Sequence, residues 1–181
     1  MKLLIASDIH GSAYWCRALM AQIEAESPDT VVLLGDLLYH GPRNDLPRDY
    51  APKEVLAMLN TLADRVVAVR GNCDSEVDQM VLDFPVLADY AVIPVGERVI
   101  YVTHGHIYNE AKLPPLCNGD ILLNGHTHIP KFTEHSDYIY MNCGSVSIPK
   151  ENSPHSYMTY ENGVFLWKNL ENGEEYLRFE I

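Results

Sequence analysis

Paired cysteines and long apolar runs are both missing from this sequence. Its four cysteines (Cys16, Cys73, Cys117 and Cys143) are scattered without a C-x-x-C pair, which argues against a disulfide framework or a cysteine-based zinc site. No stretch approaches the roughly 20 consecutive apolar residues of a membrane span. The N-terminus lacks the basic, apolar and small-residue regions of a secretory signal. We therefore expect a cytoplasmic chain with free thiols and no membrane partner.

Basic residues are also scarce. The chain has 13 Lys and Arg against 25 Asp and Glu, which gives a net charge of −12 at pH 7. Without a basic stripe, long nucleic acid is not an expected partner. A phosphate-binding site built around metal ions stays compatible with this charge, because bound divalent cations dominate the local field.

The pattern of apolar residues predicts one α/β domain, residues 1–181, with two packed sheets. Trp15, Leu19 and Ile23 recur every four positions, which predicts a helix at 13–25 capped by Ser12. A second helix is expected from Pro52, a residue favoured at the first helical position. Short apolar runs predict buried strands at 3–6, 30–34, 65–69 and 120–123. A hairpin is expected at 90–103, followed by strands at 132–135, 138–142, 156–160, 163–170 and 174–179.

Side chains of the metal-binding kinds follow five of the expected strands. Each comes after an apolar run at a turn that contains glycine, which lets the backbone bend sharply. The carboxyl ends of strands are where ligands collect in open α/β sheets. One Asp-x-His or Gly-Asp is a weak signal, but the joint occurrence at five strand ends is not coincidence. The seven candidate metal ligands are Asp8, His10, Asp36, Asn72, His104, His126 and His128.

The chemistry of these donors indicates two ions. Carboxylate, imidazole and amide oxygen form a mixed nitrogen and oxygen set, which suits Mn, Fe, Ni or Zn. Seven protein ligands are too many for one tetrahedral ion. They suit two ions that share a bridging carboxylate.

The same residues form a series of motifs: Asp8-x-His10, Gly35-Asp36, Gly71-Asn72-x-Asp74, His104-Gly105-His106 and Gly125-His126-x-His128. This series resembles the calcineurin-like metallophosphoesterase superfamily, and it is most similar to the small bacterial single-domain phosphodiesterases. The segment Asn142-Cys143-Gly144-Ser145 also resembles that subgroup, which usually has Asn-Pro-Gly-Ser.

The resemblance implies two packed mixed β-sheets flanked by helices, with two divalent metals per chain. One metal is then expected on Asp8, His10, Asp36 and His128, and the other on Asp36, Asn72, His104 and His126, with Asp36 bridging. A hydroxide between the metals would attack a small phosphodiester in line, without a side-chain nucleophile. Mn²⁺ is the metal expected in activity assays, with Ni²⁺, Zn²⁺ or Fe²⁺ as alternatives.

Cys73 departs from the superfamily, which usually has Gly-Asn-His followed by an acid at this point. That histidine is thought to contact the phosphate or protonate the leaving group, whereas a thiol is a weak donor with an ordinary pKa near 8.5. One hypothesis is that Cys73 faces the substrate and restricts efficient turnover to good leaving groups. The alternative is a small residue that fills the space of an imidazole.

Other polar residues near the motifs have less certain roles. Arg43 is a candidate for bidentate phosphate binding or is a surface residue of a proline-rich loop. His106 either orients a metal ligand or is a solvated loop residue, and Asp74 is expected to contact a neighbouring imidazole. His135 and His155 are expected at the surface.

Three alternatives to a phosphodiesterase stay open. Within the same chemistry they are a phosphomonoesterase and a dinucleoside-polyphosphate hydrolase. From a different class, a non-catalytic metal-binding scaffold for protein interactions is considered, since the retromer subunit of this fold also lacks that histidine. All seven ligand positions carry competent ligands, which favours the enzyme. A symmetric homo-oligomer is compatible with a chain of this size.

Overall fold

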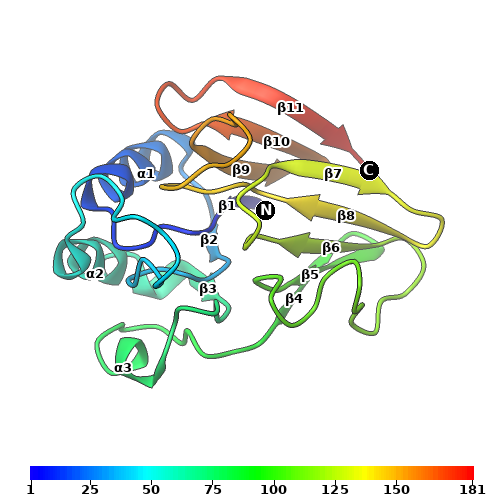
Figure 1. The fold of residues 1–181 in the computed structure, drawn as a ribbon. Coiled ribbons are helices and arrows are strands. Elements are labelled where there is room, and N and C mark those ends of the chain that lie inside the picture. The colour runs from blue at the N-terminus through cyan, green and yellow to red at the C-terminus, as the bar shows by residue number, and fades with distance from the viewer.

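Two mixed β-sheets form the body of the protein (Figure 1). The structure is a computed structural model that describes all residues 1–181. The six-stranded sheet has the order β11-β10-β9-β1-β2-β3, and the five-stranded sheet has the order β4-β5-β6-β8-β7. In each sheet parallel and antiparallel pairs occur together: β1 pairs parallel with β2 and antiparallel with β9, and β6 pairs parallel with β5 and β8 while β7 is antiparallel to β8. The predicted α/β fold of two mixed sheets is confirmed.

The strands of the first sheet come from both ends of the chain. They are β1 (Lys2–Ala6), β2 (Thr30–Leu33), β3 (Val66–Ala68), β9 (Ser156–Glu161), β10 (Val164–Asn169) and β11 (Glu175–Glu180). The strands of the second sheet are β4 (Ala91–Val95), β5 (Arg98–Val102), β6 (Asp120–Asn124), β7 (Lys131–Glu134) and β8 (Tyr138–Asn142). Every predicted strand is present with its ends within two residues of the expected positions.

The two main helices begin where the sequence predicts. Helix α1 (Ala13–Glu26) follows Ser12, whose side chain accepts a hydrogen bond from the backbone N–H of Trp15, and it ends at Ser27 in the left-handed conformation. Helix α2 (Pro52–Asn60) has proline at its first position. Two short elements were not predicted, the 3₁₀ turn Ala63–Arg65 and the four-residue helix α3 (Glu76–Gln79), because neither is long enough for helical periodicity to appear.

Alternating side chains of the six-stranded sheet supply two separate apolar cores. Leu4 and Leu33 face α1 and α2, where Leu19 and Val55 pack against them. Leu3, Ile5 and Val32 face the other sheet and pack with residues such as Ile121 and Trp167. Fully burying one such side chain contributes about 1.5–3 kcal/mol, so both faces of β1 and β2 are fixed in place, and with them the loops at their ends.

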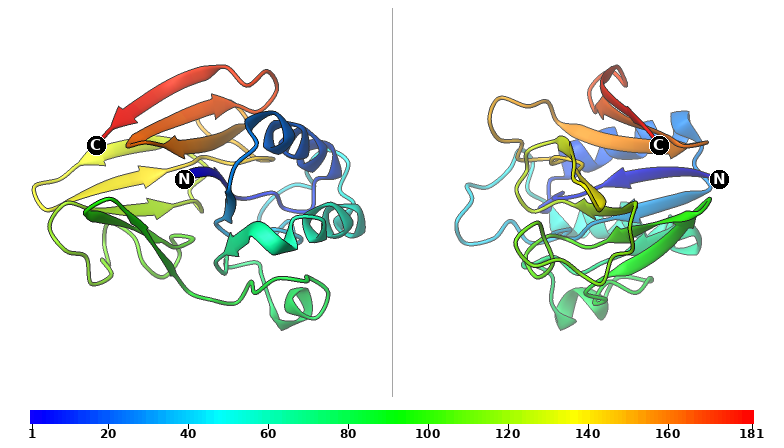
Figure 2. Two further views of the ribbon diagram at one scale, coloured as in Figure 1. Left: turned by 180° about the vertical axis from the view of Figure 1, so that it is seen from behind. Right: turned by 90° about the vertical axis from the view of Figure 1, so that its right-hand side faces the viewer.

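Helices cover only one side of the molecule. Helices α1 and α2 lie together on the six-stranded sheet, away from the five-stranded sheet (Figure 2). On the outer face of the five-stranded sheet, Tyr101, Leu122 and Tyr140 are covered by Tyr108 and Leu116 of the β5–β6 connection. The expectation of flanking helices therefore holds for the first sheet, and a loop replaces helices on the second.

No helix in the structure has both the length and the apolar character that a membrane crossing requires. The cytoplasmic location, the single domain over 1–181 and the homo-oligomer stay predictions.

Candidate metal centre

The loops that follow β1, β2, β3, β5 and β6 meet at one edge of the two sheets. Five of the seven predicted ligands on these loops have a left-handed backbone, namely Asp8 (φ 60°), His10 (φ 50°), Asp36 (φ 55°), His126 (φ 65°) and His128 (φ 64°). This conformation is uncommon for residues with a side chain and each instance costs on the order of 1–3 kcal/mol. Strain that recurs at five ligands indicates that the surrounding fold imposes the position of these side chains.

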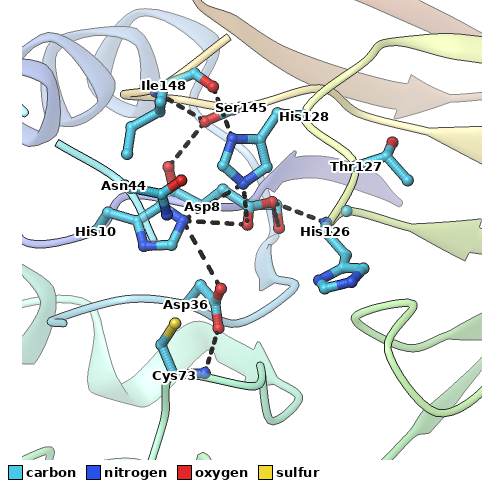
Figure 3. Close-up of polar contacts among 12 residues, drawn as sticks. Asp8, His10, Asp36, Asn44, Cys73, His126, Thr127, His128, Ser145 and Ile148 are labelled. Carbon is cyan, nitrogen blue, oxygen red and sulfur yellow. Dashed lines mark hydrogen bonds and ion pairs between the residues drawn. The ribbon is translucent and has the colours of Figure 1, made fainter. Parts of the chain in front are cut away.

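The first group of ligands comprises Asp8, His10 and His128, which point toward one another (Figure 3). The Nε2 atom of His128 lies 3.1 Å from Oδ1 of Asp8, and Nε2 of His10 lies 3.5 Å from the same oxygen. The two imidazole Nε2 atoms are 3.4 Å apart. Three candidate metal ligands from the loops after β1 and β6 thus converge on one point.

The second group comprises Asn72, His104 and His126. Nε2 of His104 lies 3.1 Å from Oδ1 of Asn72 and 3.1 Å from Nδ1 of His126. Asp36 lies between the groups, because its Oδ2 is 3.7 Å from Nε2 of His10 and 3.5 Å from Nε2 of His104. The structure therefore brings all seven predicted ligands together, with one carboxylate in contact with both groups.

Backbone carbonyls fix the orientation of three imidazoles. The Nδ1 atoms of His10, His104 and His128 lie 2.9, 2.7 and 2.6 Å from carbonyl oxygens of Tyr39, Leu34 and Ile148. A carbonyl accepts only, so each Nδ1 carries the proton and donates. The lone pair of each Nε2 then faces the centre, which is the tautomer a metal ligand needs.

Two glycines make the close approach of these loops possible. A Cβ atom on Gly71 would lie 2.1 Å from Oδ1 of Asp36, and one on Gly125 would lie 2.0 Å from Oγ of Ser7. No larger residue fits either position without moving a ligand or the hydroxyl that hydrogen-bonds Asp8. The glycines of the motifs are therefore needed for two reasons: they allow the turns, and they leave room for the neighbouring side chains.

Asp74 ties the β2 and β3 loops together. Its carboxylate accepts hydrogen bonds from the backbone N–H groups of Asp36 (2.8 Å), Leu37 (3.0 Å) and Gly71 (2.7 Å). The expected contact with an imidazole is wrong. Backbone N–H groups of the turns occupy the carboxylate in place of an imidazole. The sequence alone does not show which way these N–H groups point.

The segment Asn142–Ser145 hydrogen-bonds the backbone of the loops that carry the candidate ligands. The side-chain amide of Asn142 donates to the carbonyl of Gly125 at 2.6 Å, and Oγ of Ser145 donates to the carbonyl of Asp8 at 3.0 Å. Ser147 donates to the same Asp8 carbonyl at 3.0 Å. These residues hold the β1 and β6 loops in register.

Burial and neighbouring charges set the protonation of the ligands. Burial opposes ionisation of Asp8, but the neighbouring imidazoles of His10 and His128 outweigh it and hold the pKa of Asp8 well below its usual range. Burial likewise opposes protonation of His10, yet the Asp8 carboxylate raises the pKa of His10. Burial, followed by the proximity of His104, lowers the pKa of His126. The centre thus combines an ionised carboxylate with a neutral imidazole, both competent ligands, while at His10 a proton and a cation compete.

A cavity of about 600 Å³ opens over the centre. Five of the seven ligands line it, whereas Asp8 and His104 lie buried beneath them. Arg43 and Cys73 also line this cavity. The sequence reasoning missed three further polar residues that line the cavity, Asn44, Thr127 and Lys150. Asn44 and Lys150 lie outside the motifs, and Thr127 occupies the variable position between two ligands.

Cys73 lies within the centre and beside its shared carboxylate. Its backbone N–H donates to Oδ1 of Asp36 at 2.8 Å, and its Sγ accepts from the amide of Asn72 at 3.2 Å. Burial, and then the charge of Asp36, raises the pKa of the thiol. All four cysteines are free, as predicted.

The remaining histidines differ in their surroundings. Nδ1 of His106 is buried without a hydrogen-bond partner, and burial followed by His104 lowers the pKa of His106 to about 4. His135 is exposed and pairs with Glu110, as expected for a surface residue. His155 is half-buried and stacks on Trp15 with 3.4 Å between ring centroids, so its expected surface position is wrong. No apolar periodicity around His155 indicated that contact.

Comparison with known proteins agrees with the motif series. The sequence model of the calcineurin-like phosphoesterase superfamily domain matches residues 1–162. The chain belongs to this superfamily. It is 45% identical to phosphodiesterase YfcE of Escherichia coli K12 over 164 residues, which cover 91% of this chain and 89% of YfcE.

Solved structures of the superfamily show the same fold. The structure of YfcE, described as a phosphoesterase from E. coli, superimposes with a TM-score of 0.97 at 42% identity and covers all of both chains. Vps29 from Entamoeba histolytica in complex with Zn²⁺ superimposes with a TM-score of 0.66 at 23% identity, covering 99% of each chain. The second likeness concerns the fold alone.

Membership of the superfamily implies divalent metal binding, and the residues present fit such a cofactor. Oδ1 of Asp8 is fully buried yet accepts no hydrogen bond. An unpaired buried carboxylate oxygen is costly unless a cation satisfies it. Two groups of three side chains have their ligand atoms within 4.8 Å of one another: Asp8, His10 and His128 form one group, and Asp8, Asp36 and His104 form the other. The donor set and its geometry thus suit metal.

Proposed function

We propose that this chain is a metal-dependent phosphodiesterase that hydrolyses a P–O bond of a small phosphodiester. The observation that carries the proposal is the position of Asp36, whose Oδ2 lies 3.7 Å from one ligand group and 3.5 Å from the other. A carboxylate that contacts two sets of donors is suited to bridge two cations. The similarity to phosphodiesterase YfcE supports the diester as substrate.

Each ligand group would hold one divalent ion. Asp8, His10, Asp36 and His128 would bind the first, and Asp36, Asn72, His104 and His126 the second, with Mn²⁺ preferred and Ni²⁺, Zn²⁺ or Fe²⁺ as alternatives. When bound, two such cations would neutralise charge on the phosphoryl oxygens and lower the pKa of a water, which would supply the attacking group for in-line displacement.

The chain's own residues orient the substrate. Arg43 lines the cavity from the β2–α2 loop, where its guanidinium supports bidentate binding of a phosphoryl group. Cys73 faces the leaving group from the opposite loop. Because a metal-activated water would supply the attacking group, no side-chain nucleophile is needed, and we expect no covalent phospho-enzyme.

The test is hydrolysis of bis-p-nitrophenyl phosphate and p-nitrophenyl phosphate by metal-stripped protein, with Mn²⁺, Ni²⁺, Zn²⁺ or Mg²⁺ added back. We expect diester turnover that requires metal and falls at least about 100-fold in Asp36→Asn, because loss of one cation removes several kcal/mol of charge stabilisation. Asparagine tolerates the left-handed backbone of this position. Asp45→Asn, an exposed residue of the neighbouring loop, is the matched control and should keep full activity.

Other outcomes separate the alternatives. Faster turnover of the monoester would favour a phosphomonoesterase or dinucleoside-polyphosphate hydrolase. Absence of turnover with every metal, in protein shown to bind metal, would refute the enzyme and favour the interaction scaffold.

A further inference from the structure

We infer that a groove beside the metal centre, lined by Tyr39 and an apolar pocket, binds an aromatic leaving group of the substrate. We name it the Tyr39 groove and define its apolar end by Leu38, Tyr39, Tyr50, Leu56 and Val81. The inference rests on the proposed function, since it assigns a chemical class to the alcohol that this hydrolase would release.

The groove adjoins the candidate active site. The cavity over the metal centre and a neighbouring cavity of about 580 Å³ share four residues, Pro42, Arg43, Asn72 and Cys73. The neighbouring cavity shares Tyr39 and Asp78 with a third cavity of about 310 Å³. Cys73 therefore lies between the metal centre and the cavity that Tyr39 lines, which places the groove beside a substrate held over the metals.

Tyr39 is held in place by the metal centre itself. Its carbonyl accepts a hydrogen bond from Nδ1 of His10 at 2.9 Å, so the residue keeps a fixed distance from a metal ligand. Its ring packs edge-on against His40 with 4.8 Å between centroids, and His40 packs edge-on against Tyr50 at 5.1 Å. The Tyr39 side chain is still 42% exposed. An exposed aromatic ring suits stacking on a flat aromatic group.

The far end of the groove has the character of an apolar binding pocket. Leu38, Tyr50, Leu56 and Val81 contribute carbon surface there. The two charged residues that line it, Lys53 and Asp78, have opposite signs and leave no net charge. Val81 is 42% exposed. Leaving an aliphatic side chain in contact with water is unfavourable relative to burying it. An apolar planar group would cover this surface.

The position of Cys73 indicates which part of the substrate occupies the groove. Cys73 lies where the first two cavities meet and is proposed to face the leaving group. An alcohol that leaves on this side meets the exposed Tyr39 ring and the apolar end of the groove, which favour an aromatic group. In hydrolysis, water adds to phosphorus, the P–O bond to the alcohol breaks, and the oxygen leaves with the bonding pair. Phenol-type alcohols accept that charge best, and they are aromatic.

The experiment compares two methyl phosphodiesters with leaving alcohols of nearly equal acidity, phenol and 2-naphthol. Because the two alcohols are about equally acidic, they are about equally good leaving groups. A preference for the naphthyl ester therefore reports binding of the larger ring. We expect Mn²⁺-loaded protein to hydrolyse the naphthyl ester with at least about tenfold higher kcat/KM, through a lower KM, since stacking acts equally on ground and transition states.

Two variants locate this preference. Tyr39→Ala removes the ring but keeps the carbonyl that orients His10, and Val81→Asp places a charge at the apolar end. Both should reduce the naphthyl-to-phenyl ratio of kcat/KM to near 1. Tyr39→Phe should retain the ratio. Leu46→Ala, an exposed apolar residue of the same loop outside the groove, is the matched control.

A binding measurement separates this inference from the proposed function. In C–P analogues of the two esters, a methylene group replaces the ester oxygen, so neither analogue can be hydrolysed at this position. Calorimetry should show about tenfold tighter binding of the naphthyl analogue and loss of this difference in Tyr39→Ala. If the wild type hydrolyses neither ester but still binds the naphthyl analogue more tightly, and Tyr39→Ala loses this difference, the groove is supported and the proposed hydrolase activity is refuted.

Equal affinity of the two analogues for the wild type, or an unchanged difference in both variants, would overturn the inference. A changed oligomeric state of Val81→Asp with unaltered analogue affinity would also overturn it, and would assign the apolar end to contact with a second copy of the chain.

Discussion

In the proposed mechanism, Cys73 is the single residue that limits which leaving groups depart readily. Its backbone N–H donates to the Asp36 carboxylate, and the resemblance to the superfamily implies an imidazole at this position. Burial and the Asp36 charge raise the pKa of the thiol. We therefore expect the backbone of Cys73 to support a metal ligand and its side chain to give little help to a departing oxygen.

We expect Cys73→His to accelerate alkyl phosphodiesters at least about tenfold more than aryl phosphodiesters, because an alkoxide needs a proton and a phenolate does not. The measurement is the ratio of kcat/KM for ethyl p-nitrobenzyl phosphate and ethyl p-nitrophenyl phosphate in the two proteins. Cys73→Ser controls for loss of sulfur without gain of an imidazole. An unchanged ratio would favour the interpretation that Cys73 only fills space.

At the scale of elements, the carboxylate of Glu26 joins the end of α1 to strands β1, β9 and β10. Glu26 pairs with Nζ of Lys2 at 2.7 Å and with Nζ of Lys168 on β10. The hydroxyl of Tyr157 on β9 also donates to Glu26, at 3.1 Å. One carboxylate thus connects a helix with three strands of the six-stranded sheet.

This cluster predicts a pH dependence of stability. Burial raises the pKa of Glu26, but hydrogen bonds with Lys168 and Lys2 outweigh it, and the net pKa is lowered. A lowered pKa in the folded state stabilises the protein above the unfolded pKa, and this contribution is lost as the pH falls through the folded value. In Glu26→Gln we expect the free energy of unfolding at pH 7 to fall by about 1 kcal/mol.

Urea unfolding in EDTA between pH 7 and pH 3 measures this contribution. The difference between wild type and Glu26→Gln should shrink toward zero as the pH falls below about 4.5, the ordinary pKa of a glutamate in an unfolded chain. Glu24→Gln, an exposed residue of the same helix, should follow the wild type at every pH. A Glu26 difference that is constant with pH would show that lost packing, and no charge effect, causes it.

At the scale of the whole molecule, the metal centre concentrates strain and charge at one edge. Five ligands have a left-handed backbone, and two buried carboxylates lie among the imidazoles of a chain with net charge −12. Packing on both faces of β1 and β2 maintains this arrangement. Cations at this edge would offset the repulsion and satisfy the free Asp8 oxygen.

Metal binding should therefore raise global stability. A ligand at 100 times its Kd contributes about 2.7 kcal/mol, which corresponds to roughly 5–10 °C in Tm for a domain of this size. Thermal unfolding of metal-stripped protein with and without Mn²⁺ measures the shift. The Asp36→Asn variant should show less than half of it, and Asp45→Asn should show all of it. Equal shifts in the wild type and Asp36→Asn would place the stabilising metal elsewhere.

The sequence by itself predicted the strands, the two main helices and the seven candidate ligands. Apolar runs and helical periodicity depend on neighbours along the chain, so β1, α1 and the hairpin β4–β5 followed from local pattern. The seven ligands were predicted because carboxyl ends of strands meet at one edge, and the structure brings all seven together. Each of those inferences needed only spacing and side-chain chemistry.

Only the tertiary structure decided how those ligands are held and what surrounds them. The carbonyls that orient His10 and His128 belong to Tyr39 and Ile148, residues 29 and 20 positions away. Likewise, Asp74 contacts backbone amides instead of an imidazole, and His155 stacks on Trp15. Such contacts join loops that are distant in sequence, and their geometry depends on how two sheets pack, a property that no local pattern of residues contains.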